Sequence, residues 1–229
     1  MIAFILVFQL SGQGSLLNHF YVGEGQFFYS SGALTLGDNF QNKGTLTVEH
    51  NIDFLVNDSV GHVRLQGKES QQIVGAELWM STLEVDKTSS VALATNSVFV
   101  SEKLDLKNGS IISSEDNRLY VLGSTTEGDG YTEGPIYTIT SNPDIIIPVG
   151  LDGFTNYLML SDLNALDTIR TEAVVPNLDS LLLDADIVGI SESIEWQIAS
   201  SEDTILAKIS VAFNGVDLIN LYNQQPINA

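Results

Sequence analysis

The sequence predicts an all-β protein in which a parallel β-helix-like solenoid is followed by an antiparallel β-sandwich domain. Three observations predict this fold class. Short segments with two apolar residues on one face recur along residues 32–122, polar and glycine-rich breaks separate them, and almost no stretch has a helical period. A coil of stacked β rungs fits this pattern, because one rung alone is too small to bury its apolar face.

Each predicted rung contributes a pair of apolar side chains at alternate positions, which places both on one face of a strand. From Leu46 onward the first members of successive pairs are 17, 20, 21 and 15 positions apart. The pairs are Leu34/Leu36, Leu46/Val48, Val63/Leu65, Leu83/Val85, Leu104/Leu106 and Leu119/Val121. We therefore expect these side chains to stack in one common column inside a solenoid over residues 15–125.

The pattern changes after a polar, glycine-rich segment at residues 123–130. Beyond it the apolar runs lengthen, for example at 136–140, 168–175 and 205–213, and turn residues separate them. Several strands at this spacing are typical of an antiparallel sandwich. We therefore assign residues 126–229 to a β-sandwich-like domain.

The composition is strongly acidic and lacks cysteine. With 29 acidic residues against 9 basic ones, the net charge is −20. This charge argues against a nucleic-acid partner, because binding phosphates needs clustered Lys and Arg, and against docking to an anionic membrane surface. The absence of cysteine excludes disulfides, zinc–thiolate sites and thiol catalysis.

The first residues are typical of a secretory signal peptide. Residues 2–10 form an apolar run interrupted only by Gln9, and Ser11, Gly12 and Gly14 follow as small residues suited to cleavage. The run is too short to cross a bilayer. No basic region precedes the run. The alternative is that residues 2–10 are retained as a first buried strand. We expect a signal peptide over residues 1–14 and a secreted or extracellular cell-surface location.

Five short motifs carry a resemblance to a known group of proteins. Gln66-Gly67 is followed by QIVG at 72–75, and VSEKLDLKNGSI occupies 100–111. The remaining three are YTEGPI at 131–136, IPVG at 147–150 and EWQI at 195–198. In this order they resemble a repeated element and its following sandwich in large secreted surface proteins of Bacteroidota, although Glu102 replaces a usual glycine.

The resemblance extends over residues 15–215 and implies more than a fold. It implies a β-helix stalk followed by a sandwich, exported by type IX secretion and displayed as an adhesin-like or structural surface protein. Such proteins usually continue through further sandwich strands into a C-terminal sorting domain. Because this sequence stops at Ala229, the resemblance implies that the sandwich is truncated here.

We expect a non-catalytic, secreted or cell-surface structural or adhesin-like protein that spaces and presents a binding face. Its partner would be a surface ligand, either a glycan or a protein, with no nucleic acid, no membrane span and no cofactor. No G-x-S-x-G motif occurs, and none of the three histidines has a metal-site spacing.

Two alternatives to this function remain. One is a carbohydrate-active β-helix enzyme or glycan-binding module, and a glycosidase would need paired carboxylates beside exposed aromatic side chains. The other is an intracellular scaffold, which requires residues 2–10 to be retained.

Calcium is a weaker candidate ligand. Asp184, Asp186, Gly189 and Glu195 match positions 1, 3, 6 and 12 of an EF-hand loop, but Val188 stands at position 5, where an oxygen ligand is expected. The alternative interpretation is an acidic hairpin.

Four Asp-[Ser/Thr]-aliphatic triplets match the O-glycosylation acceptor used in Bacteroidota. The acceptor hydroxyls would be those of Ser59, Thr168, Ser180 and Thr204. The alternative is that these are ordinary residues at the start of strands. Trp79 and Trp196 lie in alternating apolar segments, which favours core packing over ligand stacking.

Overall fold

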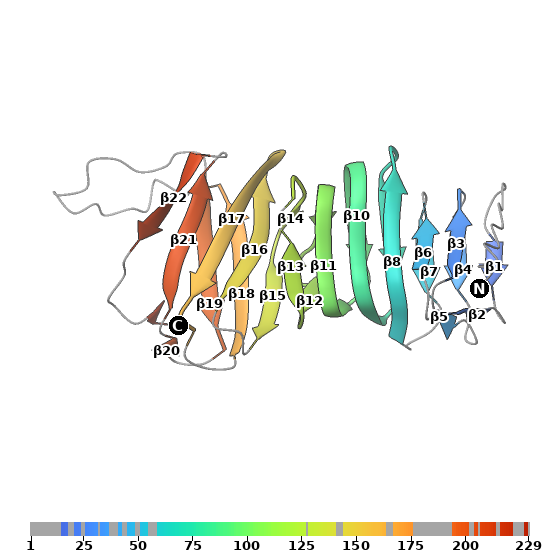
Figure 1. Ribbon diagram of the computed structural model, residues 1–229, viewed down its shortest axis with the longest axis horizontal. Helices are drawn as coiled ribbons and strands as arrows, with labels where there is room; N and C mark the ends of the chain where they lie inside the picture. The colour runs from blue at the N-terminus through green and yellow to red at the C-terminus, as the bar shows by residue number, and fades with distance from the viewer. Residues whose placement is uncertain are drawn as a thin grey trace, which may run out of the picture.

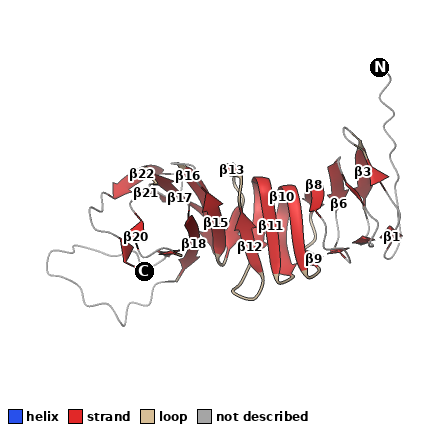
Figure 2. Ribbon diagram, turned by 90° about the horizontal axis from the view of Figure 1, so that it is seen from below, coloured by secondary structure: helices blue, strands red, loops and turns tan. Residues whose placement is uncertain are grey.

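The molecule is described by a computed structural model. The description covers residues 15–17, 21–23, 26–31, 33–36, 41–42, 45–48, 51–54, 59–126, 128–140, 144–163, 167–175, 194–201, 204–205, 207–213, 216–221 and 227–228. Within these ranges the protein is all-β with no helix, and about five turns form a parallel β-solenoid. The strands stack along the long axis of the molecule, from β1 at one end to β22 near the other (Figures 1 and 2). The predicted all-β class and the parallel solenoid are therefore confirmed.

Parallel pairing joins the strands of the solenoid. These strands are β1 (Ser15–Leu17), β2 (Tyr21–Val22), β3 (Phe27–Ser30), β4 (Leu34–Leu36), β5 (Gln41–Asn42), β6 (Thr45–Val48), β7 (Ile52–Phe54), β8 (Ser59–Gly67), β9 (Gln71–Val74), β10 (Glu77–Ala94), β11 (Ser97–Ile112), β12 (Arg118–Val121), β13 (Ser124–Thr126) and β14 (Tyr131–Glu133). Two of these, β10 and β11, are much longer than the rest because each runs through a whole turn of the coil.

Each complete turn has three faces. Along its length β11 pairs with three successive strands of the next turn, β12 at 97–100, β13 at 103–105 and β14 at 110–112. We call these the first, second and third faces. In β10 the apolar side chains at Met80, Leu83 and Val91 are all buried in one core. A straight strand could not bury all three, so β10 wraps around the core, and register shifts interrupt its ladder between the faces.

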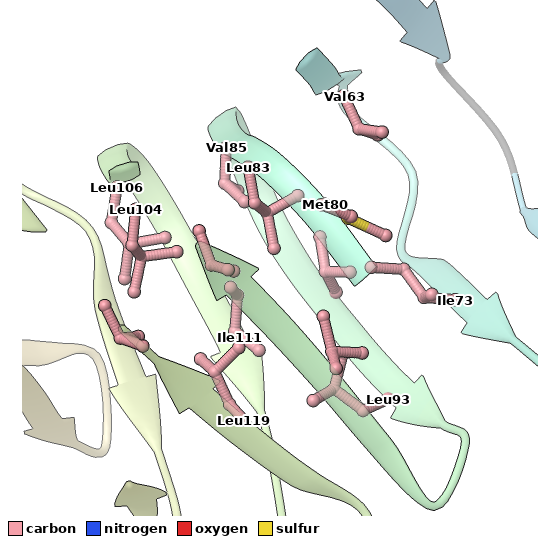
Figure 3. Packing of buried hydrophobic residues seen from close by; sticks show 14 of the residues in the cluster. Val63, Ile73, Met80, Leu83, Val85, Leu93, Leu104, Leu106, Ile111 and Leu119 are labelled. Atoms are coloured by element: carbon pink, nitrogen blue, oxygen red, sulfur yellow. The ribbon is translucent and has the colours of Figure 1, made fainter. Parts of the chain in front are cut away.

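The predicted apolar pairs all lie in the core, but they do not form one column. The pairs at 46, 63, 83 and 104 are aligned in register on the second face. Leu34 aligns instead with Ile52 and Ile73 on the third face, and Leu119 aligns with Val98 on the first. Figure 3 shows side chains from several turns converging on this core.

The three faces also explain the irregular spacing of these pairs. The 15-residue offset from Leu104 to Leu119 is a step from one face to another, because the register partner of Leu104 in the next turn is Thr125. The expectation of a single column was therefore wrong, since it assumed one strand per turn.

Two corners of the coil depend on specific residues. Gly109 has a φ of 79°, and a Cβ atom there would lie 2.6 Å from the carbonyl oxygen of Ser89. Lys87 is almost fully buried, and its Nζ donates to the carbonyl oxygens of Gln66 at 3.3 Å and Glu69 at 2.8 Å. The ammonium group thus donates to two backbone acceptors of the preceding turn, and the carbonyl oxygen of Glu69 also accepts from Ser89 Oγ at 2.8 Å.

Antiparallel pairing follows directly on the solenoid. The strands involved are β15 (Ile136–Thr140), β16 (Ile145–Leu151), β17 (Phe154–Ser161), β18 (Asp167–Val174), β19 (Glu195–Ser200), β20 (Thr204–Ile205), β21 (Lys208–Phe213), β22 (Val216–Leu221) and β23 (Ile227–Asn228). One antiparallel ladder continues the first face through β15, β18 and β19, and another continues the third face through β16, β17, β21 and β22.

No break in the sheet separates the two parts. Parallel pairing continues past residue 125, because β12 pairs with β15, and Thr132 of β14 pairs with Val149 of β16. Buried side chains of the antiparallel strands, such as Leu158 and Ile169, belong to the same core cluster as the solenoid. A separate sandwich domain with its boundary at 125/126 stays a prediction.

Candidate functional site

A row of four aromatic side chains lies on the outer surface of the first face. In β10 the neighbours Leu78 and Met80 point into the core, so strand alternation turns Trp79 outward. The parallel register then aligns Trp79 with Phe99, Phe99 with Tyr120, and Tyr120 with Tyr137. All four side chains are partly exposed. We call this row the aromatic strip.

The rings of the aromatic strip stack on one another. The ring centroids of Trp79 and Phe99 are 4.3 Å apart, those of Phe99 and Tyr120 are 4.6 Å apart, and the interplanar angles are 8° and 9°. Tyr137 follows at 4.9 Å and is tilted by 31°. Because each ring covers the face of the next, the ring edges form the accessible surface, and these edges carry the positive part of the aromatic quadrupole.

Hydrogen-bonding side chains form a parallel row beside the rings. Glu77, Ser97 and Arg118 are aligned in register on adjacent turns. Trp79 Nε1 donates to Glu77 Oε1 at 3.0 Å. The guanidinium of Arg118 donates to the carbonyl oxygen of Glu115 at 2.7 Å and lies 5.7 Å from the centroid of the Tyr137 ring. The strip therefore combines apolar surface with donors and acceptors.

A polar cluster closes the strip at its C-terminal end. Glu115 accepts hydrogen bonds from the Tyr137 hydroxyl at 2.6 Å and from Arg170 Nε at 2.8 Å, and together these lower the pKa of the Glu115 carboxyl. Burial and the negative charge of Glu115 raise the pKa of Tyr137. Arg170 also pairs with Glu172 at 2.5 Å, so this guanidinium is shared by two carboxylates. Arg170 is the register neighbour of Tyr137, and it ends the row of rings.

The second face carries a network of ion pairs. The largely buried Glu84 accepts a hydrogen bond from Lys107 Nζ at 2.5 Å, and this bond raises the pKa of Lys107. Arg64 Nε approaches Glu84 at 3.2 Å without the alignment of a hydrogen bond, so we treat that contact as Coulombic, and His62 Nε2 lies 3.2 Å from the same carboxylate. A hydrogen bond from Asn108 lowers the pKa of Asp86, with a further contribution from Arg64.

The next carboxylate of this face is held in the same way. Burial opposes ionisation of Asp105, but hydrogen bonds from Thr126 and Lys103 outweigh it and lower its pKa. These charged groups bind one another along the coil, and the network is best explained as a stabilising element between turns.

A small cavity lies near the start of β13. Its volume is about 140 Å³, and its lining includes Gly123, Ser124, Thr138 and one carboxylate, Asp144. Glycoside hydrolysis usually needs a pair of carboxylates. Within the described ranges no group of three or more His, Asp or Glu side chains is placed to hold a metal ion.

The predicted calcium ligands are not brought together by any described contact. Asp184 and Asp186 lie outside the described residues. Glu195 is in β19 opposite Val174 and accepts a hydrogen bond from Gln197 at 3.3 Å. Calcium binding stays a prediction.

The predicted glycosylation residues are placed only in part. Thr168 is half-buried in β18 and pairs with Ile139. Ser59 lies in β8 and Thr204 in β20, but their side chains are outside the description, as is the whole of Ser180. Their modification stays a prediction.

The two tryptophans have different environments. Trp196 packs against the core, as expected, whereas Trp79 faces outward, so core packing was the wrong interpretation of its segment. The other three rings of the strip were not identified from the sequence. Their spacing of 20, 21 and 17 positions carried the signal, because it follows the length of a turn.

Comparisons with protein-family models, with curated proteins and with solved structures found no match to this chain. Among the described residues, no helix is long and apolar enough to cross a membrane.

Proposed function

We propose that this chain is part of a non-catalytic, secreted or cell-surface protein of structural or adhesin-like type, in which the solenoid spaces and presents an outer binding face. The supporting observation is the continuous parallel stack from β3 to β15, with the aromatic strip along one outer side. In such a stack each turn adds about 4.8 Å to the length of the molecule. The stack therefore displays repeated side chains at regular intervals.

The charge distribution supports a spacing role. A net charge of −20 makes copies of the protein repel one another and keeps an elongated surface soluble. The cations of the second face are held by neighbouring carboxylates, for example Lys107 by Glu84 and Lys103 by Asp105. These groups stabilise the coil and do not converge on a reacting centre.

The alternative is a carbohydrate-active enzyme or a glycan-binding module. The aromatic strip with its polar row favours the glycan-binding form of this alternative, which is compatible with a presenting role. The enzyme form has less support, because the described cavity is lined by a single carboxylate, Asp144.

Two measurements test the proposal. Protease treatment of intact cells of the source organism should remove the protein, and N-terminal sequencing of the mature chain should begin after residue 14. Incubation with a panel of neutral and acidic polysaccharides should release no reducing ends and no unsaturated products. An intracellular, protease-protected chain that retains residues 2–10, or release of sugar products by the purified protein, would contradict it.

A further inference from the structure

We propose that the aromatic strip binds a neutral, linear polysaccharide that runs along the solenoid axis. This inference rests on the proposed function and names the ligand class of the presented face. The strip lies where β10, β11, β12 and β15 follow one another along the long axis (Figure 1).

The repetition of the strip fits a polymer with a repeating unit. Successive rings are 4.3, 4.6 and 4.9 Å apart, so a chain lying along the axis meets an equivalent contact at every turn. The electron-rich hydroxyl oxygens of a sugar can approach the accessible ring edges, which carry the positive part of the aromatic quadrupole. At the N-terminal end, the register partner of Trp79 is Ser59 rather than another aromatic residue, so the aligned row of rings begins at Trp79 among the described strands.

The polar row beside the rings supplies the hydrogen bonds that sugar hydroxyl groups require. Glu77 is an exposed acceptor, Ser97 is both donor and acceptor, and Arg118 is an exposed planar donor. In the described structure Arg118 makes no ion pair with a carboxylate, and its hydrogen bonds go to a backbone carbonyl and to the Tyr120 hydroxyl. It therefore keeps donors available to a ligand, unlike Arg170, which pairs with Glu115 and Glu172.

The charge pattern selects a neutral polymer over an acidic one. The rings and the serines beside them, Ser81, Ser97 and Ser101, carry no charge. The charges of Glu77 and Arg118 in the polar row are opposite in sign, whereas the whole chain carries −20. A polyanion would be repelled by the surrounding field, and a polycation would gain more from the acidic surface elsewhere. A neutral chain meets no such penalty and loses no solvated charge on binding.

A protein partner fits this surface less well. An extended peptide gains affinity by adding a strand to a free sheet edge, where backbone groups are unpaired. The strip is on the face of the sheet, and β11 is paired on both sides, by β10 and β12. Only side chains are presented, which suits a polymer whose own hydrogen-bonding groups are hydroxyls.

The test measures retention of the full chain in native affinity gels. The gels contain galactomannan, mixed-linkage β-glucan, xyloglucan, alginate, polygalacturonate or poly-glutamate. We expect retention by at least one of the three neutral polysaccharides, at a strength that does not change between 50 and 500 mM salt, because no counterions are released. The double variant F99L/Y120L should weaken this retention about tenfold while keeping apolar side chains on the strands.

The matched control is I112S, which removes an exposed apolar side chain from the third face and should leave retention unchanged. Thermal melts of both variants show whether each is folded. If F99L/Y120L does not fold, R118Q, which changes an exposed side chain of the polar row beside the strip, serves as the second variant with weakened retention. The inference is overturned if no neutral polysaccharide retains the protein, if alginate, polygalacturonate or poly-glutamate retains it more strongly, or if F99L/Y120L is retained as well as the original chain. None of these outcomes bears on the proposed cell-surface location, which protease treatment tests separately.

Discussion

The parallel and antiparallel parts of this protein treat the same kinds of side chain differently. In the solenoid, each residue is stacked on its equivalent in the turn before, so aliphatic, aromatic and charged residues form separate columns. In the antiparallel part, neighbouring strands run in opposite directions; aliphatic residues still pair, as Ile147 does with Leu158, but the aromatic row is not continued. The aromatic strip accordingly ends where Tyr137 of β15 meets Arg170 of β18.

The junction between the parts is also where the core becomes less regular. Three threonines near it, Thr132, Thr138 and Thr171, are buried with hydroxyl groups that have no hydrogen-bond partner among the described residues. The described solenoid turns before it bury aliphatic side chains at the equivalent inward positions, such as Ile111 beside Thr132 and Val121 beside Thr138. The comparison teaches that register, more than composition, gives the solenoid its uniform core.

The largest expected effect comes from the core column itself. Leu83→Ala, in the middle of the second face, should lower the free energy of unfolding by about 2–5 kcal/mol, because it leaves a cavity between turns. Leu158→Ala in β17 should act on the same cooperative transition, since both residues belong to one core. Urea denaturation followed by tryptophan fluorescence and by circular dichroism measures both. Two separate transitions, with each variant shifting a different one, would show instead that the parts are independent domains.

The next effect concerns a corner of the coil. Lys87→Met should destabilise the protein by about 1–3 kcal/mol, because the carbonyl oxygen of Gln66 loses a buried donor and that of Glu69 loses its strongest one. Lys68→Met, at an exposed position of the same region, is the control and should change stability by no more than about 0.5 kcal/mol. Equal effects of the two substitutions in urea denaturation would mean that the buried ammonium has no structural role.

Much of the solenoid could be predicted from the sequence, and there is a physical reason why the rest could not. Alternation in segments such as Leu83–Val85 identifies an inward face, and the recurrence of such segments indicates stacking. The number of strands per turn was not evident, because Leu34 and Leu119 look like the other pairs but lie on other faces. Sequence spacing measures distance along the chain, whereas membership of a face depends on where the coil turns its corners.

The binding face was harder to predict than the core. Trp79 was assigned to the core because alternation alone does not say which of two apolar sets points inward. Leu78, Trp79 and Met80 are all apolar, so their residue types do not show which of them point into the core. The difference becomes evident from the pairing with β11, where Phe99 lies beside Trp79 on the outer side. The Glu115–Arg170 contact joins residues 55 positions apart and depends on the antiparallel return of β18, which no local pattern specifies.

A smaller effect is expected at the junction. Thr171→Val replaces a buried hydroxyl, which has no partner in the described part of the chain, by a methyl group of similar size, and it should raise the free energy of unfolding by about 1 kcal/mol. Thr168→Val, a half-buried threonine of the same strand, serves as the comparison and should give no such gain. A loss of stability in Thr171→Val, measured by urea denaturation, would show that its hydroxyl makes a bond that holds β18 to the core.

The smallest expected effect is on the pH dependence of stability, at the contact between Glu115 and β18. Glu115 is ionised more readily in the folded protein than in the unfolded chain, because Tyr137 and Arg170 donate to it. A carboxyl whose pKa is lowered on folding contributes stability above its unfolded value of about 4.5, and this contribution is lost as the pH falls through the folded pKa. Because the group is mostly exposed, the contribution should not exceed about 1 kcal/mol. Glu115→Gln should therefore lower stability slightly at pH 7 and flatten its decline in acid.

The matched control is Glu77→Gln, which removes an exposed carboxylate from the other end of the same face without breaking an ion pair in the described structure. Urea midpoints measured from pH 3 to pH 7 should separate the two variants most above pH 4.5, and the difference should shrink as the pH falls further. If Glu115→Gln and Glu77→Gln followed the same curve, the contact between the Glu115 turn and β18 would not contribute to joining the parallel and antiparallel strands. The uninterrupted sheet from β12 through β15 to β18 would then be sufficient to hold the two parts together.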